Sequence, residues 1–396
     1  MYILVCNAGS TSLKLKLYDM PECAVVAQCA IERVRSADDA LFKYSNKISG
    51  EEIFLERQSI PDYRKGMDMF LSFLTSPKTG VLSRVDEIAR VGFKSVLSKN
   101  HFGVHELTEN ALDGMRQWLA LAKIHNPAYL ETIETMREVL PNALFIGVFE
   151  TAFHTGVPLE RKLYGVPYEW YEKYGVQRLG YHSASHGYIA SVLNEKSENY
   201  RAISCHLGGS CSICAIENGK SVDNSFGMSL QSGVIHANRT GDMDCDLTDF
   251  LRSEGMSDNE ITDGLVKNGG LLGISGVSGD LRYVEAAARE GNLRAKLAID
   301  VFVNGIILYI GAYYVELKGL DYLVFTGGIG ENSATVRDLV CSQLEILGVQ
   351  TDADSNKNGK GFFEISTNQS KVKVLVIPTD EELGIAKKTF EYAACN

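Results

Sequence analysis

Apolar and polar residues alternate in two short stretches that lie about half a chain apart. In the first, an apolar run over residues 3–6 is followed by a small polar segment, 7–12, and by alternation over 13–18. In the second, residues 202–218 repeat this layout, with Cys205 in the place of Cys6 and His206 in the place of Asn7. Alternation with a period of two is typical of half-buried strands. Each stretch therefore predicts a hairpin, and the repeat indicates a duplicated fold.

The turns of both hairpins have residues suited to binding an anion. The first has one glycine, three hydroxyl residues and a lysine just beyond: Gly9, Ser10, Thr11, Ser12 and Lys14. The second has Gly208, Gly209 and Ser210. Small residues let backbone N–H groups approach an anion, while hydroxyl groups and lysine add donors and charge. Either turn alone is equally consistent with an ordinary polar hairpin, but the pair favours two phosphate-binding turns that face each other.

Periodicity elsewhere predicts a mixed α/β chain. Helices are expected over 62–74, 106–119, 129–139, 182–193, 244–255, 258–267, 280–290, 293–317, 333–347 and 381–392, with two short ones within 164–174. Further strands are expected over 24–33, 88–96, 144–149, 322–326 and 373–377. Residues 33–60 read as mixed loops and strands, 327–330 as a glycine turn, and 352–361 as a solvated loop without chemistry. A domain change is expected at 156–160.

Composition narrows the class of protein. The 396 residues, 45% hydrophobic and 22% charged, allow two or three domains, and a net charge of −11 argues against a nucleic-acid surface. The N-terminus shows no signal pattern, and the apolar region 301–315 is too short to span a bilayer, which favours a buried core helix. Nine cysteines without framework spacing, with Cys211 and Cys214 as packing residues, indicate free thiols and a cytoplasmic location.

Nine motifs resemble, in chain order, those of the acetate kinase family within the actin/sugar-kinase/Hsp70 superfamily of split ATPases. They are NAGSTSLK (7–14), HNPAYL (125–130), VFETAFH (148–154), GYHSASH (180–186), CHLGGSCS (205–212), NRTGDMD (238–244), LLGISGVSGDLR (271–282), VFTGGIGEN (324–332) and VIPTDEEL (376–383). The resemblance implies an α/β fold of two ribonuclease H-like (actin-like ATPase) domains with an interdomain cleft. The N-terminal domain would span 1–155 and the nucleotide-binding domain 156–380, with the last helix, 381–396, packing back on the first domain.

The resemblance also implies an activity and a site. ATP and a short-chain carboxylate such as acetate would give ADP and an acyl phosphate, reversibly, with Mg²⁺ (or Mn²⁺) as cofactor and a homodimer as the assembly, without nucleic-acid or membrane partners. The catalytic residues would be Glu150, His182 and Arg239, with Arg239 stabilising charge on the transferring phosphoryl group. The substrate would contact Lys94, Val96, His125, Tyr181 and Leu230, while Asn7 and Glu381 would hold the metal, the latter through water. ATP would contact Ser10, Ser12, Lys14, His206, Leu207, Gly208, Gly209, Ser210, Asp280, Leu281, Arg282, Gly328, Ile329, Gly330, Glu331 and Asn332.

The residues alone leave simpler readings open. Glu150 ends a buried strand, where a carboxylate is costly unless it meets a cation or reacting group, but it could also cap the next turn. Glu381 could merely favour a helix dipole, and Arg239 could be solvated. His182 and His125 could be satisfied, partly buried histidines. The glycine turn 327–330 could be structural.

Several positions depart from the family pattern. Glu150 replaces Asp, and Lys94 stands where the family has an Arg; because Lys cannot form a bidentate fork, weaker acetate recognition is expected. Phe93 replaces a His and is expected to make the same wall more apolar. Gly209 replaces an Asn, which removes a donor to the ATP phosphates. Other acceptors, another phosphoryl donor such as pyrophosphate, or a catalytically weak nucleotide-binding or partner protein therefore remain alternatives.

Overall fold

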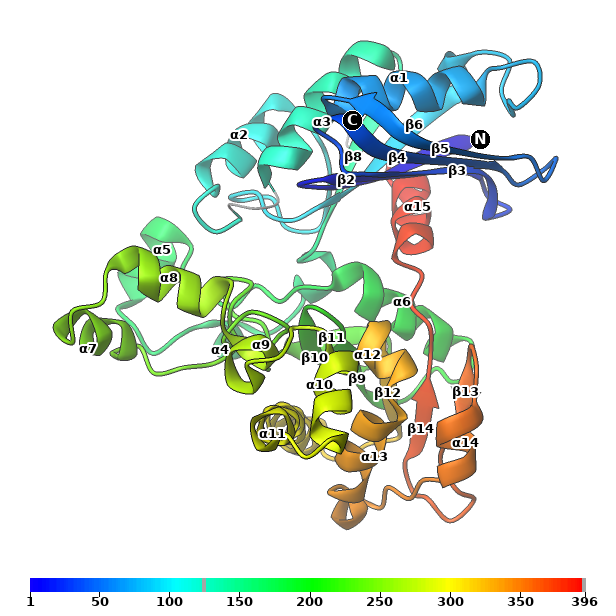
Figure 1. Cartoon of the computed structure of the whole chain (residues 1–396). Helices are drawn as coiled ribbons and strands as arrows, with labels where there is room; N and C mark the ends of the chain where they lie inside the picture. Colours follow the sequence, from blue (N-terminus) through cyan, green and yellow to red (C-terminus); the bar gives the residue numbers. More distant parts are fainter. Residues whose placement is uncertain (123–125, 394–396) are drawn as a thin grey trace. The chain divides into compact units, whose positions relative to one another are not determined.

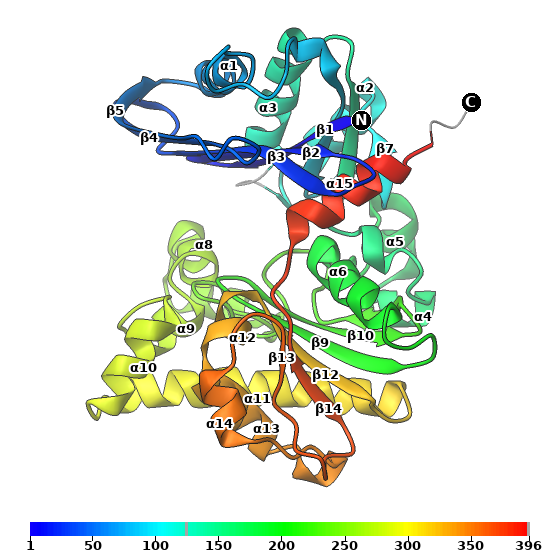
Figure 2. The same cartoon turned by 90° about the vertical axis from the view of Figure 1, so that its right-hand side faces the viewer.

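The computed structural model describes residues 1–122 and 126–393 and divides into two compact units. The N-terminal unit comprises Met1–Thr155 and Asp380–Asn396, and the C-terminal unit comprises Gly156–Thr379. Each unit is built around one sheet with helices on its faces (Figures 1 and 2).

The two sheets share the same five-strand arrangement. The N-terminal sheet has the order β5-β4-β3-β2-β1-β6-β8-β7, with β1 Tyr2–Gly9, β2 Ser12–Asp19, β3 Ala24–Glu32, β4 Ser36–Asn46, β5 Glu52–Ile60, β6 Ile88–Ser95, β7 Val104–Glu106 and β8 Leu144–Phe149. The C-terminal sheet has the order β11-β10-β9-β12-β14-β13, with β9 Arg201–Leu207, β10 Cys211–Glu217, β11 Lys220–Asn224, β12 Tyr322–Thr326, β13 Phe363–Glu364 and β14 Lys373–Val376. In each, three antiparallel strands are followed by two that run parallel to the first. This repeat confirms the predicted duplication.

Residues 33–60 contain the strands β4 and β5 with short connections, as predicted. Three other sequence-based predictions of local structure were wrong. β1 and β2 pair as far as Gly9 and Ser12, so Asn7 lies on a strand and the first turn is shorter than predicted. The glycines at 327–330 begin a helix, α12 (Gly327–Asn332), and the polar segment 352–361 contains another, α14 (Ala353–Asn358). The side chain of Asn356 in α14 is buried and accepts a hydrogen bond from Arg337 at 2.7 Å, which a solvated loop would not provide.

Helices cover both faces of the N-terminal sheet. Figure 1 shows α1 (Tyr63–Leu74) and α3 (Asn126–Val139) on one face and α15 (Glu381–Glu391) on the other. Helix α15 packs closely on β6: a Cβ atom on Gly92 would lie 2.2 Å from Oγ1 of Thr389. Arg90 of β6 donates to the carbonyl oxygens of Thr389, Phe390 and Tyr392 at 2.7–3.0 Å. A cation at the C-terminal end of a helix satisfies its last carbonyl groups and its dipole, so Arg90 fixes α15 along the sheet.

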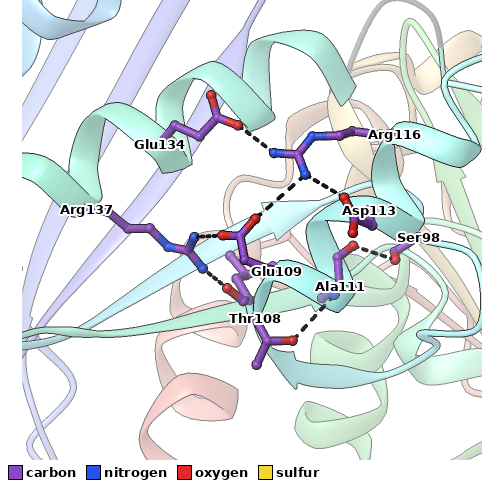
Figure 3. A network of polar contacts seen from close by, with 9 residues as sticks. Ser98, Thr108, Glu109, Ala111, Asp113, Arg116, Glu134 and Arg137 are labelled. Carbon is purple, nitrogen blue, oxygen red and sulfur yellow. Dashed lines mark hydrogen bonds and ion pairs between the residues drawn. The ribbon is translucent and has the colours of Figure 1, made fainter.

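Ion pairs join α3 to the neighbouring α2 (Glu109–Gln117) (Figure 3). Arg116 pairs with Asp113 at 2.7 Å and with Glu134 at 2.8 Å, and Arg137 pairs with Glu109 at 2.6 Å. Isolated exposed pairs contribute little, but a connected set with Arg forks holds two helices in register. The network steadies α3, which carries Tyr129 towards the site described below.

The C-terminal sheet separates two different layers. Figure 2 shows α6 (Ser183–Asn194) on one face and the long helix α11 (Leu293–Glu316) on the other. Ile203, Cys205 and Leu207 of β9 pack in one hydrophobic core with buried residues of α11. Among the described residues only α11 is long and apolar enough to span a membrane, a test that the core helix of a folded unit also passes.

The remaining helices of the C-terminal unit connect and cover this sheet. They are α4 Leu159–Lys162, α5 Tyr168–Tyr174, α7 Leu247–Ser253, α8 Asp258–Val266, α9 Gly270–Ser275, α10 Leu281–Arg289 and α13 Ala334–Ser342. The predicted pair of short helices within 164–174 is instead the pair α4 and α5, of which only α5 lies in that range.

Candidate active site

Five polar side chains, with the ammonium group of Lys94 among them, lie together in the N-terminal unit. Nζ of Lys94 lies 2.6 Å from Oε2 of Glu381 and 3.3 Å from Oε1 of Glu150. Tyr129, which also neighbours Lys94, donates to Oδ1 of Asn7 at 3.0 Å. The structure therefore gathers the predicted catalytic carboxylate, the predicted substrate-binding lysine and both predicted metal ligands.

The sheet explains why these residues meet. Asn7 and Lys94 lie near the ends of β1 and β6, and Glu150 directly follows β8; these three strands are parallel neighbours. In open α/β sheets, binding residues gather at the carboxyl ends of the strands. Glu381 comes from the first residue of α15, which the contacts of Arg90 and Gly92 hold against the same sheet.

The charge state of Lys94 follows from its two partners. Burial by itself would lower the pKa of Lys94, but Glu150 and Glu381 outweigh it and raise that pKa well above its usual value. Lys94 is therefore a permanent cation, and its charge is already shared by two carboxylates of the protein. A substrate carboxylate that bound this ammonium, as predicted, would have to compete with them.

Three other residues of the N-terminal unit, Phe93, Val96 and His125, were also expected near the substrate. Phe93 does not form a wall beside Lys94: it is fully buried and stacks on Phe145 at 6.0 Å, because adjacent strand residues point to opposite faces. That expectation was wrong. Val96 follows β6 and is buried in this unit. His125, together with Ile124, lies outside the described residues.

A pocket of about 850 Å³ lies at the corresponding edge of the C-terminal sheet. Eight of the predicted ATP-binding residues line it: Gly208, Gly209, Asp280, Leu281, Arg282, Gly328, Ile329 and Asn332. Its other lining residues are Ala237, Asn238, Gly279, Glu285 and Ser333. A volume of this size, with backbone glycines on several sides, suits a nucleotide.

The glycines of this pocket leave space for phosphate groups. A Cβ atom added at Gly209 or at Gly328 would meet no atom within 4 Å. A ligand can therefore approach the backbone closely at these two glycines. The backbone of the turn is held from behind, because the Ala237 N–H donates to the carbonyl oxygen of Gly209 at 3.1 Å.

The remaining predicted ATP-binding residues do not line this pocket. Ser10, Ser12 and Lys14 belong to the first hairpin of the N-terminal unit. Leu207 is a core residue, Gly330 is buried, and Glu331 accepts the N–H group of Gly327 at 3.0 Å. Ser210 differs, since its Oγ is buried without a hydrogen-bond partner among the described residues.

Arg239 is held by the backbone rather than by an acid. One guanidinium nitrogen donates to the carbonyl oxygen of Leu230, and no carboxylate in the described part of the chain forms an ion pair with Arg239. Burial lowers the pKa of Arg239 from its usual value, yet the group stays charged. A partly buried guanidinium without an acidic partner loses part of its hydration, and an anionic ligand would compensate for that loss.

His236 supports Arg239 and was not foreseen from the sequence. It is fully buried, and burial together with the charge of Arg239 lowers its pKa to about 3. Its Nδ1 accepts the Cys211 N–H group at 3.0 Å, and its ring stacks on Phe226. His236 is therefore neutral and leaves Arg239 as the cation of this segment. The sequence position of His236, three residues before Arg239, could have indicated that the two residues lie close together.

His182 lies in a group of histidines and serines. It has a left-handed backbone conformation (φ 58°) and precedes α6, and its Nδ1 lies 2.8 Å from Oγ of Ser212. Its ring centroid is 4.1 Å from that of His206. The predicted catalytic histidine and the predicted nucleotide-contacting histidine are thus neighbours.

The predicted acyl-pocket residues of this unit contribute mainly to its interior. Tyr181 is fully buried, and its hydroxyl group donates to the carbonyl oxygen of Met228 at 2.6 Å. Leu230 is partly buried and supplies the carbonyl oxygen that holds Arg239. Tyr181 precedes His182 in the sequence, and Leu230 binds Arg239 through its carbonyl oxygen. Both residues therefore help to position a predicted catalytic side chain.

Comparisons with known proteins agree with these features. The model of the acetokinase family matches residues 2–387. An acetate kinase from Treponema denticola is 40% identical over 395 residues, which cover 98% of this chain and 99% of the relative. The crystal structure of Porphyromonas gingivalis acetate kinase superposes with a TM-score of 0.88 at 37% identity, covering 98% of each chain. A propionate kinase from Francisella tularensis gives 0.89 at 31% identity over 99% of this chain and all of the other. Since both sequence and fold match over almost the whole length, the chain belongs to the acetokinase family.

Proposed function

We propose that this protein transfers the γ-phosphoryl group of ATP to a short-chain carboxylate, reversibly, to give ADP and an acyl phosphate. A carboxylate oxygen attacks the γ-phosphorus while the bond to the β-phosphate oxygen breaks, with the two oxygens in line. The observation that carries the proposal is the glycine-lined pocket of about 850 Å³ in the C-terminal unit of a chain with this family membership.

Arg239, the partly buried cation of the C-terminal unit, would take part in the transfer. Negative charge spreads over the equatorial oxygens of the phosphoryl group as it moves. Arg239, which has no acidic partner among the described residues, would stabilise that charge. The neutral state of its neighbour His236 keeps a second positive charge away from the same place.

The donor set near Lys94 fits a magnesium ion. Mg²⁺ prefers oxygen ligands and keeps several waters. Asn7 offers an amide oxygen and Glu381 a carboxylate, so these residues would hold the ion, largely through water. When bound, the ion would neutralise charge on the β- and γ-phosphates. Lys94 already pairs with Glu381, so its ammonium and the metal draw on the same carboxylate.

A coupled assay with a panel of acceptors tests the function. Acetate, propionate and butyrate are compared at saturating Mg²⁺-ATP, and pyrophosphate is offered as an alternative donor. We expect ATP-dependent acyl phosphate formation, accompanied by millimolar or tighter ADP binding in calorimetry. Activity with pyrophosphate alone would favour the other donor, and absent nucleotide binding would favour a partner protein instead.

Replacing Gly209 by Asn should strengthen ATP binding. The position has ordinary backbone angles and open space toward the pocket, so an Asn side chain fits and adds a donor for phosphate. A hydrogen bond to a charged group contributes about 1.5–3 kcal/mol, so KM for ATP should fall about tenfold or more. Gly209→Ala is the matched control, because it adds a side chain without a donor. Equal KM values for the two variants would contradict this reading.

Two properties of the whole molecule belong to the same proposal. We place the protein in the cytoplasm, which its free cysteines support. We also propose a homodimer, because α11 exposes Leu297, Leu308 and Val315, which are 52%, 65% and 73% accessible. Light scattering at micromolar concentration should give about twice the 43.5 kDa of one chain.

A further inference from the structure

Helix α6 packs on the C-terminal sheet through polar side chains, where a core would normally be apolar. Side chains alternate along a strand, so Ser204 and His206 of β9 share the face that α6 covers, and Ser212 of β10 pairs directly with His206. From the helix side, His182, Ser185 and His186 complete the group. Ser185, His186, Ser204 and Ser212 have no solvent exposure, and that of His182 is 9%. Buried polar groups of this kind are costly unless each is hydrogen-bonded.

Four of these side chains form a linear hydrogen-bonded chain. Oγ of Ser204 lies 3.0 Å from Nδ1 of His186, and Nε2 of His186 lies 2.7 Å from Oγ of Ser212. The same Ser212 oxygen lies 2.8 Å from Nδ1 of His182. A separate pair joins Oγ of Ser185 to Nδ1 of His206 at 2.8 Å.

The available donors and acceptors fix which group donates in each of these hydrogen bonds. Among the residues that the structure describes, Nδ1 of His186 is the sole acceptor within reach of the Ser204 hydroxyl group. If His186 donated to Ser204, the buried hydroxyl hydrogen of Ser204 would be left without an acceptor, a loss of about 1–3 kcal/mol in a protein interior. Ser204 therefore donates to Nδ1 of His186. A neutral imidazole then carries its proton on Nε2, which donates to Ser212.

The hydrogen bond between Ser212 and His182 determines which ring nitrogen of His182 carries the proton. Because the Ser212 oxygen accepts from His186, its own hydrogen points to Nδ1 of His182. Nδ1 of His182 is then an acceptor, and its proton is on Nε2. By the same count, Ser185 finds its only described acceptor in Nδ1 of His206, so His206 also carries its proton on Nε2.

We propose that Ser204, His186 and Ser212 are positioning residues that hold His182 in the Nε2–H form, with Ser185 doing the same for His206. Both neighbouring rings are then neutral and carry their proton on Nε2, the form in which that nitrogen donates to an oxygen acceptor. Any role of these rings towards a phosphoryl group rests on the proposed function, whereas the proton positions do not. Neutral rings also suit a centroid separation of 4.1 Å, at which two cations would repel.

Nitrogen NMR of the full chain tests the proton positions without substrate. Protein labelled with ¹⁵N in its histidines is examined at pH 8, where an ordinary imidazole is neutral. Single His182→Gln and His206→Gln variants assign the signals. We expect both rings to show a protonated Nε2 and an unprotonated Nδ1. An Nδ1–H signal, or a doubly protonated ring, for His182 in the wild type would overturn the proposal.

Variants of Ser204 test whether this residue controls the proton position of His182 without touching it. Ser204→Ala removes the donor that sets the direction, although Ser204 does not touch His182. We expect the His182 signals to shift toward a mixture of the two forms and kcat to fall about tenfold, with KM for ATP within twofold. Ser204→Thr keeps a hydroxyl group and should restore the wild-type spectrum. Ser191→Ala, also on α6, is the control, since within the described part of the chain Ser191 donates only to the Tyr188 carbonyl oxygen.

The outcomes separate this inference from the proposed function. An unchanged His182 spectrum in Ser204→Ala would refute the positioning role of Ser204, whatever the activity. A protein with the expected spectra but no acyl phosphate formation would refute the function and leave the proton positions established. If Ser204→Ala fails to fold, the wild-type spectrum alone still decides the direction of the chain.

Discussion

Arg239→Ala should reduce kcat for phosphoryl transfer by about 10³-fold or more and leave the affinity for ADP nearly unchanged. An arginine that acts on the charge developing in the transition state typically contributes on this scale, which corresponds to about 4 kcal/mol of barrier. Arg239 does not line the pocket proposed to bind the nucleotide, so ground-state binding should survive its loss. Steady-state kinetics with acetate and calorimetry with ADP measure the two effects separately.

A second arginine of the same unit provides the control. Arg294 also donates to backbone carbonyl oxygens, those of Ile274 and Gly273, but it is exposed and away from the pocket. Arg294→Ala should keep kcat within threefold. Near-normal turnover in Arg239→Ala would show that the guanidinium of Arg239 is only structural, and an equal loss in both variants would indicate a general effect on folding.

Lys94→Met should be the most destabilising of the substitutions considered in the N-terminal unit. It removes the ammonium that lies between Glu150 and Glu381 and leaves two carboxylates close together in a largely buried place. Removing one partner of a buried ion pair costs about 3–5 kcal/mol. The urea midpoint should therefore fall clearly. Lys388→Met, which breaks an exposed pair with Glu391 on the same helix α15, should cost less than about 1 kcal/mol.

Lys94→Arg tests whether the single ammonium group at this position limits the recognition of acetate. Arginine meets a carboxylate with two parallel hydrogen bonds, so part of its fork can serve the substrate while the rest contacts a protein carboxylate. We expect kcat/KM for acetate to rise about tenfold, with little change in the urea midpoint. Robust wild-type activity on acetate that the arginine fails to improve would mean that the single ammonium is already well placed.

Local pattern was sufficient for the fold but not for every contact of the site. The two hairpins follow from alternation with a period of two, and the glycine motifs marked the turn and helix that line the pocket. The same period would have placed Phe93 and Lys94 on opposite faces of β6, so that error was avoidable. In contrast, α14 has a polar sequence, and Asn356 is buried only because Arg337 from another helix reaches it. Such a contact has no local signal.

The histidine and serine group shows the same limit. His182, Ser185 and His186 have the spacing of one helix face, and Ser204 and His206 the spacing of one strand face. Each set alone reads as ordinary polar residues. Their chemistry arises when α6 packs on β9 and β10, and the pairing of His206 with Ser212 sets the contacts. Likewise, Lys94 was expected to meet a substrate, whereas its nearest acids come from β8 and from a helix almost three hundred residues later.

The return of α15 to the N-terminal unit sets an order of events during synthesis. Residues 1–155 leave the ribosome long before Glu381, Ile385 and Thr389, and at about 5–20 residues per second the intervening segment takes roughly 10–45 s. During that interval the groove beside Gly92 has no helix to fill it, and Lys94 lacks one of its two carboxylates. The nascent N-terminal unit therefore exposes the surface that Ile385 and Thr389 later cover. The cation site around Lys94 is therefore completed only after the whole C-terminal unit has been synthesised.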